Sequence, residues 1–144
     1  MRASYLVHAD GERDGMDYTP ESSRRARGVP VWAAIRGLGR SGVADLVDCC
    51  CALARRFADR LGEHEEVEVL NEVVLNQVLV RLRGDDAGTL ELVRRVQADG
   101  TCWLGGTSWR GRPAVRISVS NWSTDESDVD AAVGVILRCA ELAG

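Results

Sequence analysis

The long apolar stripe between residues 43 and 61 constrains the fold of this chain more than any other feature of its sequence. Apolar residues recur there in steps of three, four and seven, which is the spacing of one face of an α-helix. Charged residues, among them Asp48, Arg55 and Asp59, occupy the opposite face, and Ser41 stands where an N-cap residue is expected. A helix with one apolar face must pack on another layer, so the chain is expected to form a layered domain.

Further elements are predicted on both sides of this helix. A shorter helix is expected upstream, from Val29-Pro30 to about residue 39, with proline in its first turn. Downstream, a short strand is predicted at 67–70 and a longer one at 77–83, where Val78, Val80 and Leu82 lie on one face. The turn at 84–86 then leads into a helix that is expected to end at Asp99-Gly100.

A hairpin and a last helix complete the pattern. The arms of the hairpin are predicted at 101–109 and 114–121, joined by a Gly-Arg-Pro turn at 111–113. Residues 123–126, Ser-Thr-Asp-Glu, match a capping box that opens a helix with an apolar stripe from 129 to 140. One-sided helices beside a mostly antiparallel sheet make the expected fold class α+β, a two-layer α/β sandwich with the helices on one face.

Composition excludes several classes of function. At 144 residues and a net charge of −4, the chain suits one folded domain and has no basic stripe for nucleic acid. Its apolar runs are too short for a membrane span, and the one at the N-terminus is too short for a signal peptide. We therefore expect no nucleic-acid or membrane partner and a cytoplasmic location.

The cysteine and histidine residues do not form a recognisable site. Cys49, Cys50 and Cys51 are consecutive, so on a helix they point about 100° apart, and they are expected to be small buried side chains. His8 and His64 lie far from any cysteine pair, so neither a metal site nor a catalytic triad is expected. The tryptophans near the hairpin are expected in the core or at an interface.

Four blocks of residues resemble a known family. They are Tyr5-Leu6 with Asp17-Tyr18, the Arg-rich stretch 23–37 with its tryptophan, Asn76 with the strand behind it, and Arg-Ile-Ser-Val-Ser-Asn at 116–121 with the following helix. In this order they resemble the C-terminal part of the group II pyridoxal-phosphate (PLP) decarboxylases, which include the aromatic-amino-acid and glutamate decarboxylases. The resemblance implies the small C-terminal domain of fold-type I PLP enzymes, with 1–28 as a mobile loop and linker and 29–144 as the domain.

The resemblance also implies roles for individual residues. In the family, a loop tyrosine that follows an acidic residue donates the proton that reaches Cα after CO₂ leaves; Tyr18, which follows Asp17, matches it. Arg116 matches an arginine that faces the substrate carboxylate, a task suited to its planar fork of donors. The alternatives are an ordinary loop tyrosine and an arginine in an interdomain or surface ion pair. Arg24 and Arg25 are assigned to packing and domain docking.

The cofactor of the family is PLP, yet all 18 basic side chains counted as Lys or Arg are arginines. Without a lysine the chain cannot form the Schiff base of that cofactor, so no cofactor-binding residue is expected in it. It is interpreted as the substrate-contacting domain of an amino-acid decarboxylase, inactive alone, which works with a second copy or with a large-domain chain that carries the lysine. The alternative is a truncated non-catalytic remnant that acts as an interaction or dimerisation module. Which amino acid is the substrate stays open.

Overall fold

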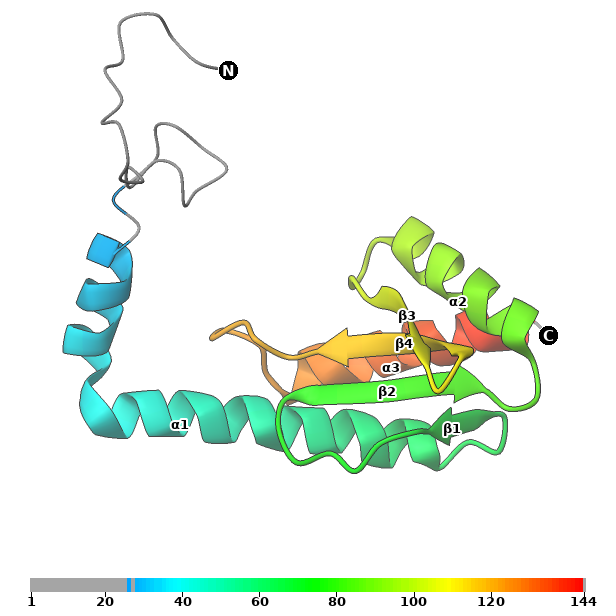
Figure 1. Ribbon diagram of the computed structural model, residues 1–144, viewed down its shortest axis with the longest axis horizontal. Coiled ribbons are helices and arrows are strands. Elements are labelled where there is room, and N and C mark those ends of the chain that lie inside the picture. The colour runs from blue at the N-terminus through cyan, green and yellow to red at the C-terminus, as the bar shows by residue number, and fades with distance from the viewer. Residues whose placement is uncertain (1–25, 27, 144) are drawn as a thin grey trace, which may run out of the picture. The chain divides into compact units, whose positions relative to one another are not determined.

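The computed structural model describes residue 26 and residues 28–143, which divide into two compact units between Arg40 and Ser41. No helix of these residues is long and apolar enough to cross a membrane. The elements are α1 (Gly28–Gly62), β1 (Val67–Val69), β2 (Gln77–Leu82), α2 (Asp86–Asp99), β3 (Gly105–Trp109), β4 (Arg112–Ser118) and α3 (Glu126–Glu141) (Figure 1).

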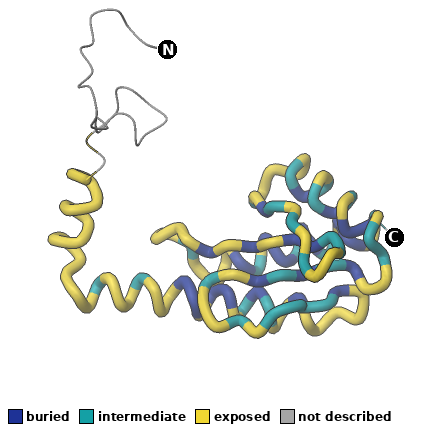
Figure 2. Tube along the Cα trace, in the orientation of Figure 1, coloured by how far each residue is buried: buried dark blue, intermediate teal, exposed yellow. Residues whose placement is uncertain are grey.

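The second unit contains a four-stranded sheet in the order β1-β2-β4-β3, and every neighbouring pair is antiparallel. The register places Val80 opposite Val115 and Val78 opposite Ile117, so their side chains share one face. This face forms a single core with the apolar faces of α2, α3 and the second half of α1 (Figure 2). The structure confirms the predicted α+β class.

Helix α1 contains the two helices that the sequence predicts, joined at a kink. Gly39 has φ 65° and ψ −172°, values that interrupt the helix and that glycine adopts without a Cβ clash. Downstream of the kink, the predicted stripe is buried only from Cys50 to Leu61. Val43 and Val47, at the start of the stripe, are 37% and 49% exposed.

Two local predictions were wrong. The capping box of α3 lies two residues further on: Asp125 is the N-cap, and its carboxylate accepts hydrogen bonds from the backbone N–H groups of Ser127 and Asp128. Ser123 is not the cap because its N–H and hydroxyl instead donate to the side-chain oxygen of Asn121. The hairpin turn is Arg110-Gly111, both with positive φ, which is the conformation of a two-residue hairpin loop whose twist matches its strands.

The first arm of the hairpin is also shorter than predicted, since β3 begins at Gly105 rather than at residue 101. Residues 101–104 form a connection outside the sheet, in which Leu104 is buried and its carbonyl accepts a hydrogen bond from Gln97 of α2 at 2.9 Å. In this connection the Leu104 carbonyl therefore bonds to α2, and residues 101–104 do not pair with β4.

Helices α1 and α3 are joined by a bidentate ion pair. Nε of Arg56 donates to Oδ1 of Asp130 at 3.0 Å, and Nη2 donates to Oδ2 at 2.7 Å. The hydrogen bond from Arg56 holds the pKa of the Asp130 carboxyl below its ordinary value of 3.8. Paired carboxylates of this kind stabilise the folded state while they are ionised.

We expect the free energy of unfolding to fall as the pH drops below about 4, the ordinary pKa of aspartate. The pKa of Asp130 is lower in the folded than in the unfolded chain, so its stabilisation is present above the unfolded value and is lost as the pH falls through the folded value. Urea unfolding at a series of pH values measures this. Asp130→Asn should flatten the acid limb, whereas Asp59→Asn, in α1 and without an ion-pair partner among the described residues, should not. An unchanged acid limb in Asp130→Asn would contradict the assignment.

Candidate functional site

Arg116 lies in the middle of β4, on the face of the sheet that points away from the core. It is paired with Leu79 of β2 on one side and with Gly105 of β3 on the other. Its neighbours in the strand, Val115 and Ile117, point into the core, so the alternation of β4 turns Arg116 outward. The side chain is exposed, as a residue that meets a ligand from outside the domain must be.

The other arginines of this outer face already have carboxylate partners. Nε of Arg81 donates to Oε2 of Glu68 at 2.8 Å, and Arg112 contacts Asp86 through Nη2 at 2.7 Å and Nε at 3.1 Å. These hydrogen bonds hold the pKa of the Glu68 and Asp86 carboxyl groups below their ordinary values. Within the described part of the chain, the guanidinium of Arg116 has no hydrogen-bond or ion-pair partner, which leaves its fork of donors available to an external anion.

Small neighbours keep the approach to Arg116 open. A Cβ added at Gly105, directly opposite, would meet no atom within 4 Å. Ala114 and Ser118, two residues away along β4 on the same face, are also small. A carboxylate can therefore reach the guanidinium without displacing a bulky side chain of β3 or β4.

Two asparagines fix the strands around Arg116. Asn76 extends the ladder beyond β2, because its carbonyl accepts from the N–H of Val119 at 3.0 Å and its Nδ2 donates to the Val119 carbonyl at 2.7 Å. Oδ1 of Asn71 accepts from the N–H of Leu79, the residue opposite Arg116, at 2.8 Å. The sequence singled out Asn76 without a role and missed Asn71, whose only signal was its place in a polar connection between two strands.

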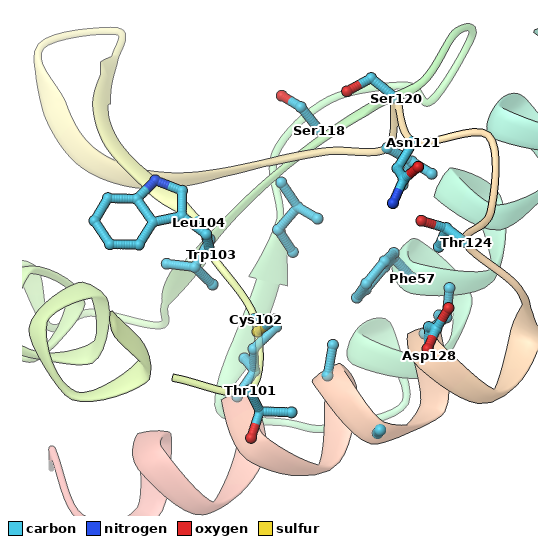
Figure 3. Close-up of a pocket in the computed structure, with 16 residues that line it drawn as sticks. Phe57, Thr101, Cys102, Trp103, Leu104, Ser118, Ser120, Asn121, Thr124 and Asp128 are labelled. Carbon is cyan, nitrogen blue, oxygen red and sulfur yellow. The ribbon is translucent and has the colours of Figure 1, made fainter. Parts of the chain in front are cut away.

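A pocket lies on the core side of the sheet, and Arg116 is not among the residues that line it (Figure 3). It has a volume of about 500 Å³ and lies between the connection 101–104, the end of β4 and the start of α3. Figure 3 shows Asn121 and Thr124 directed toward Phe57 on its floor, while the hydroxyls of Ser118 and Ser120 point away. Cys102 is also among the lining residues, and burial raises the pKa of its thiol above the ordinary value.

The cysteines and tryptophans are only partly where the sequence places them. Cys50, Cys51 and Cys139 are buried as expected, but Cys49 is exposed, because it lies on the outer side of α1. Trp103 and Trp122 are 78% and 81% exposed, so neither belongs to the core. Across residues 28–143, no group of three or more histidine, cysteine or acidic side chains could hold a metal ion.

Tyr18, Arg24 and Arg25 lie outside the described residues, as does nearly all of the segment 1–28 that was expected to form a loop and linker. Of the two candidate site residues, the structure therefore describes Arg116, and the role of Tyr18 stays a prediction from the sequence.

Comparisons with known proteins agree on one family. The model of the pyridoxal-dependent decarboxylase conserved domain matches residues 1–83. Over 135 residues the chain is 28% identical to the 3,4-dihydroxyphenylacetaldehyde synthase of Drosophila melanogaster. The matched region covers 89% of this chain and 26% of that relative. The Oryza sativa TDC, solved with PLP and tryptamine, superposes with a TM-score of 0.76 at 23% identity and covers 90% of this chain and 29% of its own.

The Catharanthus roseus tryptophan decarboxylase, solved in complex with L-tryptophan, superposes with a TM-score of 0.75 at 18% identity, over 84% of this chain and 26% of its own. At these identities the superpositions show a shared fold. The chain thus spans about a quarter of the length of the first curated relative and of both solved structures.

Proposed function

The chain belongs to the pyridoxal-dependent decarboxylase family, whose model matches more than half of its residues, and on this premise we propose that it is the C-terminal, substrate-contacting domain of a PLP-dependent amino-acid decarboxylase. Because the chain spans about a quarter of the relatives' length, the decarboxylase activity is assigned to a larger assembly that contains this domain. Its five cysteines are free thiols, which supports a cytoplasmic location.

The observation that carries the proposal is the guanidinium of Arg116, which has no partner among the described residues, on a sheet face where Arg81 and Arg112 are paired with carboxylates. A guanidinium donates two parallel hydrogen bonds to a carboxylate and so fixes the orientation of that group as well as its position. In this role Arg116 holds the carboxylate that leaves as CO₂. Asn71 and Asn76 support it by fixing the strands on which it stands.

We assign the proton transfer to Tyr18. A phenol is a suitable general acid because it keeps its proton at neutral pH and can donate it to a basic carbon held within hydrogen-bond reach. In the family, the loop tyrosine that follows an acidic residue has this role. Tyr18, which follows Asp17, matches that tyrosine in the sequence. A loop that closes over the substrate also excludes water, which favours proton delivery by the side chain.

PLP, when bound, supplies an electron sink for the carbanion left by decarboxylation. The residues of this chain do not match the part of a decarboxylase that binds PLP covalently. A Schiff base with PLP needs a positioned primary amine, and the chain has no lysine. The cofactor therefore belongs to a lysine-bearing polypeptide that adjoins this domain. Each role proposed here concerns binding and proton transfer by this chain's own side chains.

The chain alone is expected to bind no PLP covalently through a side chain. The purified chain mixed with PLP should develop no stable absorption band and should release no CO₂ from amino acids. After borohydride reduction, which fixes imines as amines, a pyridoxyl adduct is expected at most at the α-amino group of Met1, the one primary amine of this sequence. A chain joined to a lysine-bearing segment of a family member serves as the positive control. A stable band and a specific PLP adduct on the isolated chain would contradict this assignment.

A second candidate function is that of an interaction or dimerisation module. The observation that favours it is the run of exposed apolar side chains in α1 before the kink, which includes Trp32 and Ile35. The two functions are compatible, since a substrate-contacting domain without its own cofactor site needs a partner.

A further inference from the structure

The pocket on the core side of the sheet has an apolar interior. Phe57 forms its floor, and Leu104, Ile117 and Ile136, which are all buried, are among its other lining residues (Figure 3). Its volume of about 500 Å³ is within the range of cavities that bind small molecules. The pocket is therefore large enough for one aromatic ring with a short side chain, and its interior favours an apolar body.

The end of the pocket near the start of α3 is polar, because Asn121, Thr124 and Asp128 line it there. Oδ2 of Asp128 accepts a hydrogen bond from the N–H of Asp125 at 3.1 Å, as part of the capping box. Within the described part of the chain, Oδ1 of Asp128 and the hydroxyl of Thr124 have no hydrogen-bond partner. Both oxygens can therefore accept a hydrogen bond from a ligand.

The charge of the lining residues determines the sign of the ligand. Asp128 is the only carboxylate among them, and none of them is an arginine or a histidine. The positive end of α3 does not offset this charge, since the N–H groups of Ser127 and Asp128 already donate to the carboxylate of Asp125. Residues 41–144 contain eleven arginines against seventeen aspartates and glutamates, so the whole unit is negatively charged. The pocket thus attracts a cation and repels an anion.

We propose that this pocket binds a small arylalkyl amine, in which a short chain joins a primary ammonium group to an aromatic ring. The ring lies against Phe57 in the apolar interior, in the offset or edge-to-face contact that aromatic pairs adopt. The ammonium group donates hydrogen bonds to the carboxylate of Asp128 and to the hydroxyl of Thr124. Its third N–H remains in contact with water, because Asp128 lies at the exposed rim of the pocket.

This amine site is separate from the carboxylate site proposed at Arg116. Ile117 follows Arg116 in β4 and lines the pocket on the core side, whereas Arg116 points to the opposite face of the sheet. The proposal uses neither Arg116 nor Tyr18. Its failure would leave the decarboxylase assignment in place, and loss of that assignment would leave the amine site in place.

Nuclear magnetic resonance on the full chain tests the site with the probes 2-phenylethylamine, 3-phenylpropionate and ethylamine. Phe57 is the only phenylalanine of the chain, so labelling phenylalanine with carbon-13 gives ring signals from this residue alone. We expect 2-phenylethylamine to shift these signals with a dissociation constant below about 1 mM. The anion 3-phenylpropionate has the same ring with the opposite charge, and ethylamine has the charge without the ring. Each should bind at least tenfold more weakly.

Asp128→Asn removes the charge of the site but keeps an amide oxygen that can accept from the N–H of Asp125. It should raise the dissociation constant of 2-phenylethylamine about fivefold, as expected for a partly exposed ion pair. The matched control is Glu126→Gln, in the same turn of α3. Glu126 contacts Arg56 at 3.1 Å and is not a lining residue, so this change should stay within about twofold.

Both substituted residues are exposed, so the spectra of the free variants should show an unchanged fold. A chain that binds 2-phenylethylamine no more tightly than ethylamine would overturn the proposal, as would equal binding of 3-phenylpropionate. Equal losses in Asp128→Asn and Glu126→Gln would also overturn it, because they would indicate attraction to the acidic unit as a whole and no contact with Asp128.

Discussion

Replacing Arg116 by alanine is expected to lower kcat/KM for decarboxylation by about 100-fold, which is about 2.7 kcal/mol of lost transition-state stabilisation. The assay uses a chimera in which this chain replaces the matching segment of the Catharanthus roseus tryptophan decarboxylase, with L-tryptophan as substrate. The physical reason is the loss of two charge-assisted hydrogen bonds to the carboxylate, each stronger than a neutral hydrogen bond. Arg116→Lys should recover part of the activity, because lysine keeps the charge but lacks the planar fork.

Arg110→Ala is the matched control for this substitution. Arg110 is also an exposed arginine, but it lies outside the strands, in the β3–β4 turn, where its guanidinium lies 5.8 Å from the centre of the Trp109 ring. Its removal should leave kcat/KM within about twofold, a change of less than 0.5 kcal/mol. Equal losses in both variants would indicate a general effect of sheet charge and would contradict a specific carboxylate contact at Arg116.

Leu92→Ala should cause the largest loss of stability among the substitutions considered, about 3 to 4 kcal/mol. Leu92 of α2 is 1% exposed and belongs to the core cluster, so truncation removes buried methyl groups and leaves a cavity. For a unit of roughly 100 residues, each kcal/mol corresponds to a shift of about 4 to 8 °C in the melting temperature. Thermal unfolding followed by circular dichroism should therefore show a decrease of more than about 12 °C.

The control is in the same helix. Leu90 is 51% exposed, two residues before Leu92, so Leu90→Ala removes the same atoms from the surface. Its effect should stay below about 1 kcal/mol, as is usual for surface substitutions. Similar melting temperatures for the two variants would mean that α2 does not pack on the core through the face assigned to it.

The parts of the fold that follow from one-sided burial could be predicted from the sequence. Strand β2 lies where alternation indicated it, because one face of the strand must meet the core. Strand β1 lies within the short strand predicted at 67–70. The end of α2 at Asp99, with Gly100 at φ 80°, follows from the preference of glycine for the left-handed C-terminal position.

Features that depend on competing local bonds could not be predicted. The pattern at 123–126 fits a capping box as well as 125–128 does, and only the hydrogen bonds of Ser123 to Asn121 decide between them. The pair of Arg56 and Asp130 joins residues 74 positions apart, and sequence alone does not indicate which of several arginines meets which carboxylate. The exposure of Val43 and Val47 could not be predicted either, because helical spacing does not show where the neighbouring layer ends.

The candidate site also has features that the sequence predicts and features that only the structure shows. The alternation of β4 predicts that Arg116 points away from Val115 and Ile117, but no pattern shows that Glu68 and Asp86 are taken by other arginines. That information comes only from the tertiary structure, and it separates Arg116 from Arg81 and Arg112. The assignment of a carboxylate to it then rests on the chemistry of the guanidinium and on the family.

The central claim is that Arg116 recognises the carboxylate of the substrate, and two inhibitors of the chimera test it most directly. Tryptamine keeps the amine of tryptophan but lacks the carboxylate, whereas indole-3-propionate keeps the carboxylate but lacks the amine. The account predicts that Arg116→Ala raises the inhibition constant of indole-3-propionate at least tenfold, about 1.4 kcal/mol, and leaves that of tryptamine within about twofold. Equal changes for both inhibitors, or no change for either, would contradict it.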